Sequence, residues 1–409
     1  MTDSRDRRRL NVLAERTRPA YVVWELTLKC DHACTHCGSR AGFPRDHELS
    51  TQEALRVVDD LAKAGAQEVA LIGGEAYLHD GFLAIVEALR DRKIGAALVT
   101  GGRGITAELA RELARLDLTH ASVSVDGLEE THDRMRHLRG SYRSAMTALD
   151  HLREAGVPTA SNINLNRTNH RDLEPLFEVL RARGIQGWQI QLTAPLGRAA
   201  DRTAMLLQPW ELVDVVPRVA EIKRRAREVG IVVTPGNNLG YFGPEETLLR
   251  SIAATDNDHW QGCQAGKFVM GIESDGSVKG CPSLQSSAYV RGNLRDRPLE
   301  EVWRTTPPEK TLWGFCAECP FASTCQGGCT FTAHAVFGRP GNNPYCHYRA
   351  RHFAKRGLRE RLVPATPPPG TPFDSGTFDL VVEALDAPEP YLPSNDSVDS
   401  SLVSLRIPK

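Results

Sequence analysis

From Tyr21 to Leu192 the chain alternates short β-rich runs with amphipathic helical stretches. Strands that alternate with helices form parallel pairs, because each helix connects the end of one strand to the start of the next. This alternation therefore constrains the fold more than any other feature. It predicts an α/β fold in the form of a partial, TIM-like (β/α)6 barrel. The predicted strands are Tyr21–Leu28, Glu68–Ile72, Gly95–Thr100, Thr119–Val125, Pro158–Leu165 and Gly187–Leu192. The predicted helices are Thr51–Ala64, Phe82–Asp91, Ala107–Leu116, Tyr142–Ala155, Arg171–Arg183 and Trp210–Val229, several of which follow a Ser, Thr or Asn in capping position.

The 409 residues divide into five predicted parts. A flexible tail (1–18) precedes the barrel (19–205), a bridging helical segment (206–260) leads to a cysteine-rich domain (261–362), and a Pro-, Ser- and Asp-rich tail (363–409) is predicted to be largely disordered. Charge is balanced, with 50 basic and 51 acidic residues, which argues against a nucleic-acid partner. No apolar run approaches the ~18 residues of a membrane span and no secretory signal is seen, so a cytoplasmic location is predicted.

The ten cysteines fall into two groups. In a reducing compartment, cysteines at such spacing are metal ligands rather than disulfides. The front group has C-x3-C-x2-C spacing on one loop, and three thiolates would leave one iron of a four-iron cluster open. His32 or His36 would instead complete a zinc site, so zinc stays an alternative. The front group is Cys30, Cys34 and Cys37, and the rear group is Cys263, Cys281, Cys316, Cys319, Cys325, Cys329 and Cys346.

Unusual residues follow the first four predicted strands. Cys30 follows the first, Gly73-Gly74-Glu75 the second, Gly101-Gly102 the third and Asp126-Gly127 the fourth. In parallel α/β folds, ligands bind at the carboxyl ends of the strands. The sequence therefore predicts one active site built from these strand ends.

The front cysteine motif, placed after a strand and followed by β-α units, resembles the signature of the radical S-adenosylmethionine (SAM) enzymes. The resemblance implies a [4Fe-4S] cluster on Cys30, Cys34 and Cys37 whose open iron binds the amine and carboxylate of SAM. It also implies reductive cleavage of SAM to a 5′-deoxyadenosyl radical, which abstracts hydrogen from a substrate. A reducing partner such as flavodoxin or ferredoxin would supply the electron.

The same resemblance implies a set of SAM contacts. Glycine lets the backbone approach a ligand closely, and a carboxylate accepts hydrogen bonds from an ammonium group. Ala76 stands where many members have proline after the glutamate, and Thr100-Gly101-Gly102 departs from the common T-N-G, so no contact is assigned to it. For Ser124 and Asp126 a strand-end turn, and for Arg136 a surface ion pair, are the structural alternatives. The implied contacts are His36 beside the adenine, Gly73, Gly74 and Glu75 at the methionyl amine, and Ser124, Asp126 and Arg136.

The rear cysteines resemble the SPASM domain of radical SAM peptide maturases. The resemblance implies two auxiliary [4Fe-4S] clusters, which makes three clusters in all. A zinc-ribbon-like structural site is the alternative. In the implied wiring, Cys316, Cys319, Cys325 and Cys346 hold one cluster, and Cys263, Cys281 and Cys329 hold the other, with water, another side chain or substrate as fourth ligand.

These features predict an enzyme that matures a ribosomally made peptide, through an intramolecular crosslink or another oxidative change. Pro282 follows Cys281 where sulfatase-maturing relatives have an acidic base, which argues against formylglycine formation. The short segment before the first strand has no room for a winged-helix recognition domain, so a separate recognition protein is expected to present any leader peptide. The alternative is a radical SAM oxidoreductase acting on a small molecule or haem precursor. An iron–sulfur electron carrier would have no use for Gly74, Glu75 or Ser124.

Overall fold

The computed structural model describes residues 18–253, 255–284, 287–305, 310–365, 376 and 378–389. A ten-stranded sheet forms its centre, in the order β10-β9-β8-β1-β2-β3-β4-β5-β6-β7. Strands β1 to β7 are parallel, β8 is parallel to β1, and β9 and β10 are antiparallel. The strands are β1 (Tyr21–Glu25), β2 (Glu68–Ile72), β3 (Gly95–Thr100), β4 (His120–Ser124), β5 (Thr159–Leu165), β6 (Gly187–Leu192), β7 (Val232–Pro235), β8 (Val269–Ile272), β9 (Ser277–Lys279) and β10 (Val290–Asn293).

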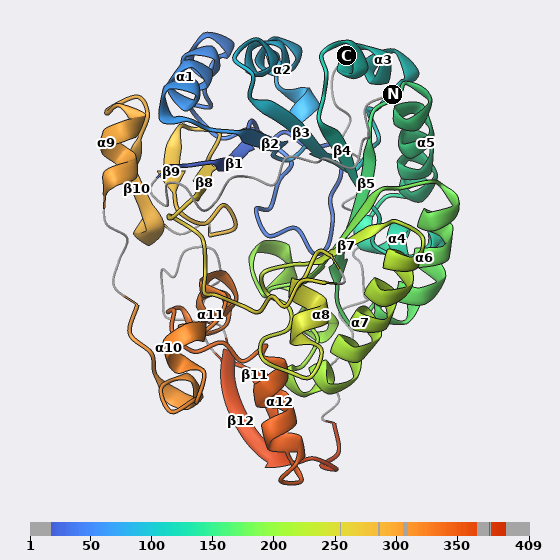
Figure 1. Ribbon diagram of the computed structural model, residues 1–409, viewed down its shortest axis with the longest axis vertical. Coiled ribbons are helices and arrows are strands. Elements are labelled where there is room, and N and C mark those ends of the chain that lie inside the picture. The colour runs from blue at the N-terminus through green and yellow to red at the C-terminus, as the bar shows by residue number, and fades with distance from the viewer. Residues whose placement is uncertain are drawn as a thin grey trace.

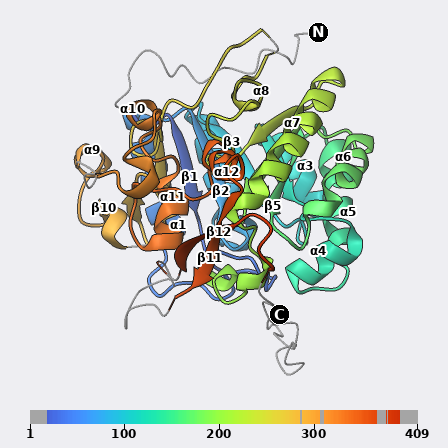
Figure 2. The same ribbon diagram turned by 90° about the horizontal axis from the view of Figure 1, so that it is seen from below.

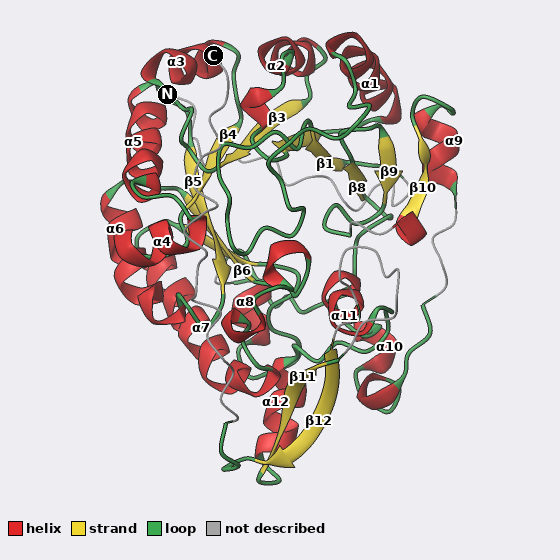
Figure 3. Ribbon diagram, turned by 180° about the vertical axis from the view of Figure 1, so that it is seen from behind, coloured by secondary structure: helices red, strands yellow, loops and turns green. Residues whose placement is uncertain are grey.

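Helices cover the outer face of this curved sheet (Figure 1, Figure 3). The first begins at a capping box between Ser50 and Glu53 and ends at Gly65 in the left-handed conformation, as its sequence signals require. None of the helices in the described ranges is long and apolar enough to cross a membrane. The helices are α1 (Thr51–Ala64), α2 (Phe82–Asp91), α3 (Ala107–Arg115), α4 (Glu129–Arg136), α5 (Ser141–Glu154), α6 (Leu173–Ala182), α7 (Leu212–Glu228), α8 (Glu246–Arg250), α9 (Leu299–Arg304), α10 (Ala322–Cys325), α11 (Thr330–Phe337) and α12 (His347–Ala354).

The hydrophobic core lies between the sheet and its helices. Trp24 and Leu71 are fully buried there, and Trp188 of β6 stacks on Phe177 of α6 with ring centroids 6.2 Å apart. Each such side chain contributes about 1.5–3 kcal/mol by leaving water. Because successive strand residues point to opposite faces, the alternate positions face the barrel interior.

The interior face changes character across the sheet. On β1 to β3 it carries residues such as Val23, Ala70 and Val99, whereas on β4 to β6 it carries serine, asparagine and glutamine. The loop from β1 to α1, which contains the front cysteines, runs through this interior (Figure 1). The polar side of the barrel and the cysteine loop therefore share one space.

The predicted α/β barrel with a C-terminal cysteine-rich domain is confirmed, with two corrections to its extent. The six predicted strands and six predicted helices all form within a few residues of their predicted bounds. A seventh parallel strand, β7, lies inside the segment 206–260 that was predicted to be helical. Its four residues are too short to stand out from the sequence, and pairing with β6 stabilises them. The predicted N-terminal tail lies almost wholly outside the described residues.

The prediction of disorder for 363–409 is wrong for one segment. Residues Phe378–Ala384 form β12, which pairs antiparallel with β11 (Leu358–Pro364). Glu383 accepts hydrogen bonds from Arg359 and Arg361 across this ribbon. Strand pairing and these ion pairs order a sequence whose composition alone favours disorder. The ribbon lies beside α12, at the opposite end of the molecule from α1, α2 and α3 (Figure 1, Figure 2); the other residues of that tail, except for a few neighbours of β12, lie outside the described ranges.

Candidate active site and cluster-binding cysteines

The front cysteine loop is held in the barrel by contacts from distant elements. Arg198, after β6, donates from Nε to the Cys34 carbonyl at 2.7 Å and from Nη1 to the Ala41 carbonyl at 3.0 Å. Thr35 donates from its backbone N–H (2.8 Å) and Oγ1 (3.0 Å) to the carbonyl of Met135 at the end of α4. These contacts fix the loop backbone without using a cysteine side chain, so the three thiols stay available.

The three front thiols suit a metal cluster. All ten cysteines of the chain are free, and Cys34 is buried while Cys30 and Cys37 are partly buried. Burial raises the pKa of Cys34 to about 11, so its side chain is a neutral thiol at pH 7 unless a bound metal displaces the proton. The soft donor set fits an iron–sulfur cluster.

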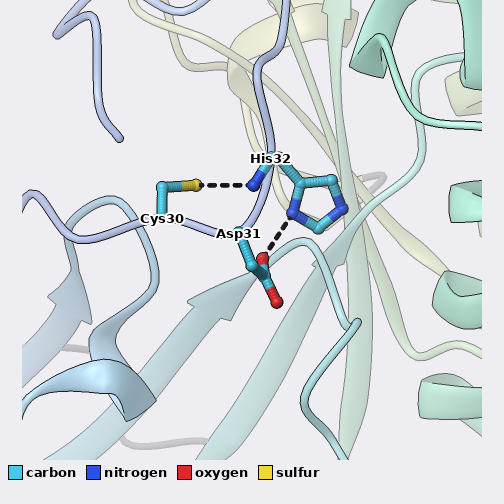
Figure 4. Close-up of side chains that lie close together, drawn as sticks. All are labelled: Cys30, Asp31 and His32. Carbon is cyan, nitrogen blue, oxygen red and sulfur yellow. Dashed lines mark hydrogen bonds and ion pairs between the residues drawn. The ribbon is translucent and has the colours of Figure 1, made fainter. Parts of the chain in front are cut away.

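A second grouping competes for Cys30. Its sulfur, a carboxylate oxygen of Asp31 and a ring nitrogen of His32 lie within 4.8 Å of one another, which a metal ion could use (Figure 4). However, His32 Nδ1 is 2.7 Å from Asp31 Oδ1, and Tyr77 donates to Asp31 Oδ2 at 2.9 Å. The carboxylate thus has partners in the protein, and a zinc ion there would leave Cys34 and Cys37 unused.

Glu75 lies buried at the carboxyl end of β2, 2% exposed. Its carboxylate accepts hydrogen bonds from Thr100 Oγ1 (2.5 Å) and from the Gly101 backbone N–H (2.6 Å). Burial raises the pKa of Glu75 to about 7, against the lowering effect of the Thr100 bond. Sequence reasoning assigned no contact to Thr100 and Gly101, and here they orient the carboxylate; their only signal was their place at the end of β3.

The two glycines before Glu75 are needed for packing. A Cβ on Gly74 would lie 2.2 Å from the Lys29 carbonyl oxygen and 2.7 Å from Cys30 Cβ, and one on Gly73 would lie 2.2 Å from the Thr27 carbonyl oxygen. The glycine loop therefore lies directly against the start of the cysteine loop. Glu75 is positioned relative to the cysteines by this contact.

Asp126, Arg136 and His36 form a buried charged group. Arg136 donates from Nε to Asp126 Oδ2 at 2.7 Å, and His36 Nε2 lies 3.3 Å from the same oxygen. Burial would raise the pKa of Asp126, but Arg136 and His36 outweigh it and hold the pKa far below its usual range. Arg136 is only 7% exposed, so the interpretation as a surface ion pair is wrong. His36 Nδ1 is buried without a partner in the described residues, which fits a ligand at this position.

Ser124 lies at the end of β4 beside this group. Its hydroxyl donates to Asn162 Oδ1 on β5 at 3.1 Å. A Cβ on Gly101 would lie 2.8 Å from Glu75 Oε1 and 3.3 Å from Arg136 Nη1, so the ends of β2, β3 and α4 meet at one point. The structure thus brings Glu75, Arg136 and Asp126 to the cysteine loop, to which His36 itself belongs.

Four rear cysteines line one pocket. Its wall is otherwise mainly aromatic, and Phe242 stacks on Phe321 at 4.3 Å between ring centroids. Burial raises the pKa of Cys325 to about 12, so its side chain is a neutral thiol unless a bound metal displaces the proton. The cysteines are Cys316, Cys319, Cys325 and Cys346, the same four to which the resemblance to the SPASM domain assigns one auxiliary cluster.

The remaining three rear cysteines lie near one another. Burial raises the pKa of Cys281 to about 12, and the neighbouring thiols of Cys329 and Cys263 add to this shift. Lys310 lies between the two sets: it donates to the Gly328 carbonyl (3.1 Å) and to Thr330 Oγ1 (3.2 Å), on either side of Cys329. Burial lowers the pKa of Lys310, and thiols of both sets oppose that shift. Sequence reasoning missed this lysine because no motif marks it.

Comparisons with known proteins agree with this geometry. The radical SAM superfamily model matches residues 24–180, and the SPASM iron–sulfur cluster-binding model matches residues 263–330. A mycofactocin maturase of Mycolicibacterium smegmatis is 31% identical over 339 residues, which span 80% of this chain and 82% of that protein. The chain belongs to the radical SAM superfamily.

This radical SAM chain is also similar to a second curated relative and to a solved structure. An AdoMet-dependent heme synthase of Nitratidesulfovibrio vulgaris is 27% identical over 359 residues, which span 81% of this chain and 92% of that protein. The crystal structure of Streptococcus suis SuiB bound to S-adenosylmethionine matches with a TM-score of 0.62 at 15% identity, over 81% of this chain and 76% of that one, which shows a shared fold. The chain is a radical SAM enzyme with a SPASM domain, and it uses SAM and iron–sulfur clusters.

Proposed function

We propose that this enzyme matures a ribosomally made precursor peptide by radical chemistry, forming an intramolecular crosslink or another oxidative change. In this proposal the enzyme binds three [4Fe-4S] clusters. Cys30, Cys34 and Cys37 bind the first, the four cavity cysteines (Cys316, Cys319, Cys325 and Cys346) bind the second, and Cys263, Cys281 and Cys329 bind the third. The front cluster with SAM supplies a 5′-deoxyadenosyl radical that abstracts hydrogen from the substrate.

The residues of this chain have distinct roles in that proposal. Glu75, oriented by Thr100 and Gly101, accepts from the methionyl ammonium of SAM. Ser124 offers a hydroxyl group to the remaining part of SAM, and the Asp126–Arg136 pair offers fixed charges to it. His36 faces the adenine of SAM. Buried, preoriented groups of this kind bind a polar ligand without reorganising.

The observation that carries the proposal is the presence of two rear cysteine sets in addition to the front loop. A single SAM cleavage needs only the front set. Further clusters can take the electron left when a substrate radical closes a new bond, since such clusters cover a wide range of potentials. The 31% identity to a mycofactocin maturase supports a peptide as the substrate.

A second candidate is oxidation of a haem precursor. The identity to AdoMet-dependent heme synthases, at 27% over most of both chains, favours it. These two candidates share the SAM site and differ in what enters the barrel. A porphyrin brings several carboxylates, whereas a peptide brings a neutral backbone.

Anaerobic incubation with dithionite, SAM and each short peptide encoded beside the gene tests the proposal, with iron coproporphyrin III as the competing substrate. Mass spectrometry should show a peptide lighter by hydrogen atoms, formed together with 5′-deoxyadenosine. A flavodoxin or ferredoxin should replace dithionite, and a separate recognition protein should lower the peptide KM where one is encoded. Conversion of the porphyrin with no change in any peptide would reject the maturase.

A further inference from the structure

Two rows of amides cross the inner face of the barrel. On β5 and β6, Asn162 is paired with Gln189, and Asn164 is paired with Gln191. Their neighbours Ile163 and Ile190 point into the core and are fully buried. Gln189 is exposed, and Asn164 and Gln191 are half-buried, so these amides face an open interior. Such a run of amides is unusual on parallel strands, which are mostly Val, Ile and Leu.

The amide rows border the candidate SAM site. Asn162 accepts a hydrogen bond from Ser124 at 3.1 Å, and the backbone N–H of Asn164 donates to Asp126 Oδ1 at 3.0 Å. A molecule lying on Asn164 and Gln191 is therefore next to the groups proposed to hold SAM. The rows lie where a substrate has to be.

These amides have unused hydrogen-bonding capacity. Gln191 donates from Nε2 to Asn164 Oδ1 at 3.2 Å, which leaves Asn164 Nδ2 as a donor and Gln191 Oε1 as an acceptor. The side chain of Gln189 has no hydrogen-bond partner among the described residues. A ligand that displaces water from this face must provide both donors and acceptors, because a buried unpaired amide costs about 1–3 kcal/mol. An extended peptide backbone provides one of each per residue.

The same face offers little to an anion. Strands β1 to β7, all within the described ranges, contain no lysine and no arginine. Cations at the strand ends have partners: Arg136 binds Asp126, and Arg198 binds two loop carbonyls. Carboxylates placed on this face would lose hydration without gaining a counter-charge, which is costly. The face therefore suits a neutral, hydrogen-bonding ligand better than a porphyrin with several carboxylates.

We propose that Asn164, Gln189 and Gln191 form the substrate-binding surface, and that it takes an extended, uncharged segment of a peptide. The inference rests on the proposed function, since it assigns the substrate class of the same interior. It goes further by locating recognition on the β5 and β6 side of the barrel and by making it a matter of backbone hydrogen bonds.

The test uses anaerobically reconstituted holoenzyme with SAM present. The probes are a fluorescein-labelled synthetic peptide with the sequence of the adjacent short reading frame, followed by anisotropy, and iron coproporphyrin III, followed by absorbance. The double variant Asn164→Leu/Gln191→Leu keeps side chains of similar size and removes the amides. Gln52→Leu, an exposed glutamine on the outer helix α1, is the matched control.

The double variant should bind the peptide about ten- to hundredfold more weakly, as expected for the loss of two hydrogen bonds, and the control should bind it as the wild type does. Iron content and SAM affinity verify the fold. Should the double variant lose iron, Gln189→Leu replaces it and should weaken binding by a smaller factor.

The two failures look different. Unchanged peptide affinity in the double variant, with the peptide still modified by wild-type enzyme, would overturn the surface and leave the maturase in place. Tight binding of iron coproporphyrin III with no binding of the peptide would overturn both. Equal weakening of porphyrin and peptide would overturn the assignment to an uncharged ligand.

Discussion

The front and rear cysteine sites are built in opposite ways. The front ligands lie within eight residues, Cys30 to Cys37, and distant groups such as Arg198 and Met135 hold their loop. The rear ligands extend from Cys263 to Cys346, and the fold itself gathers four of them around one cavity. The front site is therefore specified by neighbouring residues, and the fold only orients it. The rear site exists only once the fold has brought distant cysteines together.

Their surroundings differ as well. The front loop is adjacent to buried charges, namely Glu75 and the Asp126–Arg136 pair. The rear cavity has aromatic walls, with Phe315 and Tyr348 among its lining, and the half-buried Lys310 lies near it. Buried charges are retained where a polar ligand binds, and an apolar shell shields a redox centre. These surroundings agree with the proposal of a SAM site in front and electron-accepting clusters behind.

The largest expected effect separates the sites by chemistry. Replacing Cys30, Cys34 and Cys37 together with alanine should reduce reductive SAM cleavage to the background, because no open iron remains. The rear clusters should persist, so iron should fall from about twelve to about eight atoms per chain. Deoxyadenosine chromatography and iron analysis measure both. One four-iron cluster with stoichiometric zinc in the wild type would contradict the whole comparison.

The rear site should act later in the reaction. Cys346→Ala removes one ligand from the cavity set, and a folded variant should still form deoxyadenosine while making little modified peptide. Because cluster ligation and folding are coupled, circular dichroism must first show native structure. Full product yield with normal coupling to SAM cleavage would refute an electron-acceptor role for that cluster.

The third expectation concerns what stabilises the rear cavity. Arg349 of α12 donates to both carboxylate oxygens of Glu360 at 2.6 Å, and both residues are buried. Glu360→Gln removes the counter-charge, and the free energy of unfolding should fall by about 3–5 kcal/mol. Denaturant titration measures it. The matched control is Glu300→Gln, whose exposed pair with Arg304 should be worth about 0–1 kcal/mol; equal losses in both variants would contradict the expectation.

Glu75→Ala sharpens the assignment of the front site. It removes an acceptor for the methionyl ammonium and no cluster ligand, so SAM should bind about ten- to hundredfold more weakly, equivalent to about 1.5–3 kcal/mol. The iron content should stay the same. Equilibrium dialysis with labelled SAM measures the affinity, and an unchanged value would show that the Gly73-Gly74-Glu75 segment has another role.

The smallest expected effect lies between the two rear sets. Lys310→Met removes a positive charge that interacts with cysteines of both, so the midpoint potentials of the auxiliary clusters should shift to lower values. Lys310→Arg keeps the charge, so its midpoint potentials should stay close to those of the wild type. A redox titration followed by electron paramagnetic resonance reads this independently of turnover. Potentials that are equal in all three proteins would leave Lys310 with a structural role only.

Much of the candidate active site follows from the sequence alone. The spacing of Cys30, Cys34 and Cys37, the Gly73-Gly74-Glu75 segment and the capped helix at 51–64 are set by neighbours within a few residues, so their pattern is legible in the sequence. The alternation of strands and helices likewise predicts the parallel sheet, because each unit folds from contiguous residues.

The rest depended on contacts between residues far apart in the chain. The hydrogen bond from Arg198 to Cys34 joins positions 164 residues apart, and β12 forms by pairing with β11. The roles of Thr100 and Gly101 became visible once β2 and β3 lay side by side, and the place of Lys310 once the rear cysteines had gathered. Such contacts form because folding packs together surfaces that are far apart in the sequence. The local spacing of residues does not predict which of these surfaces will be in contact.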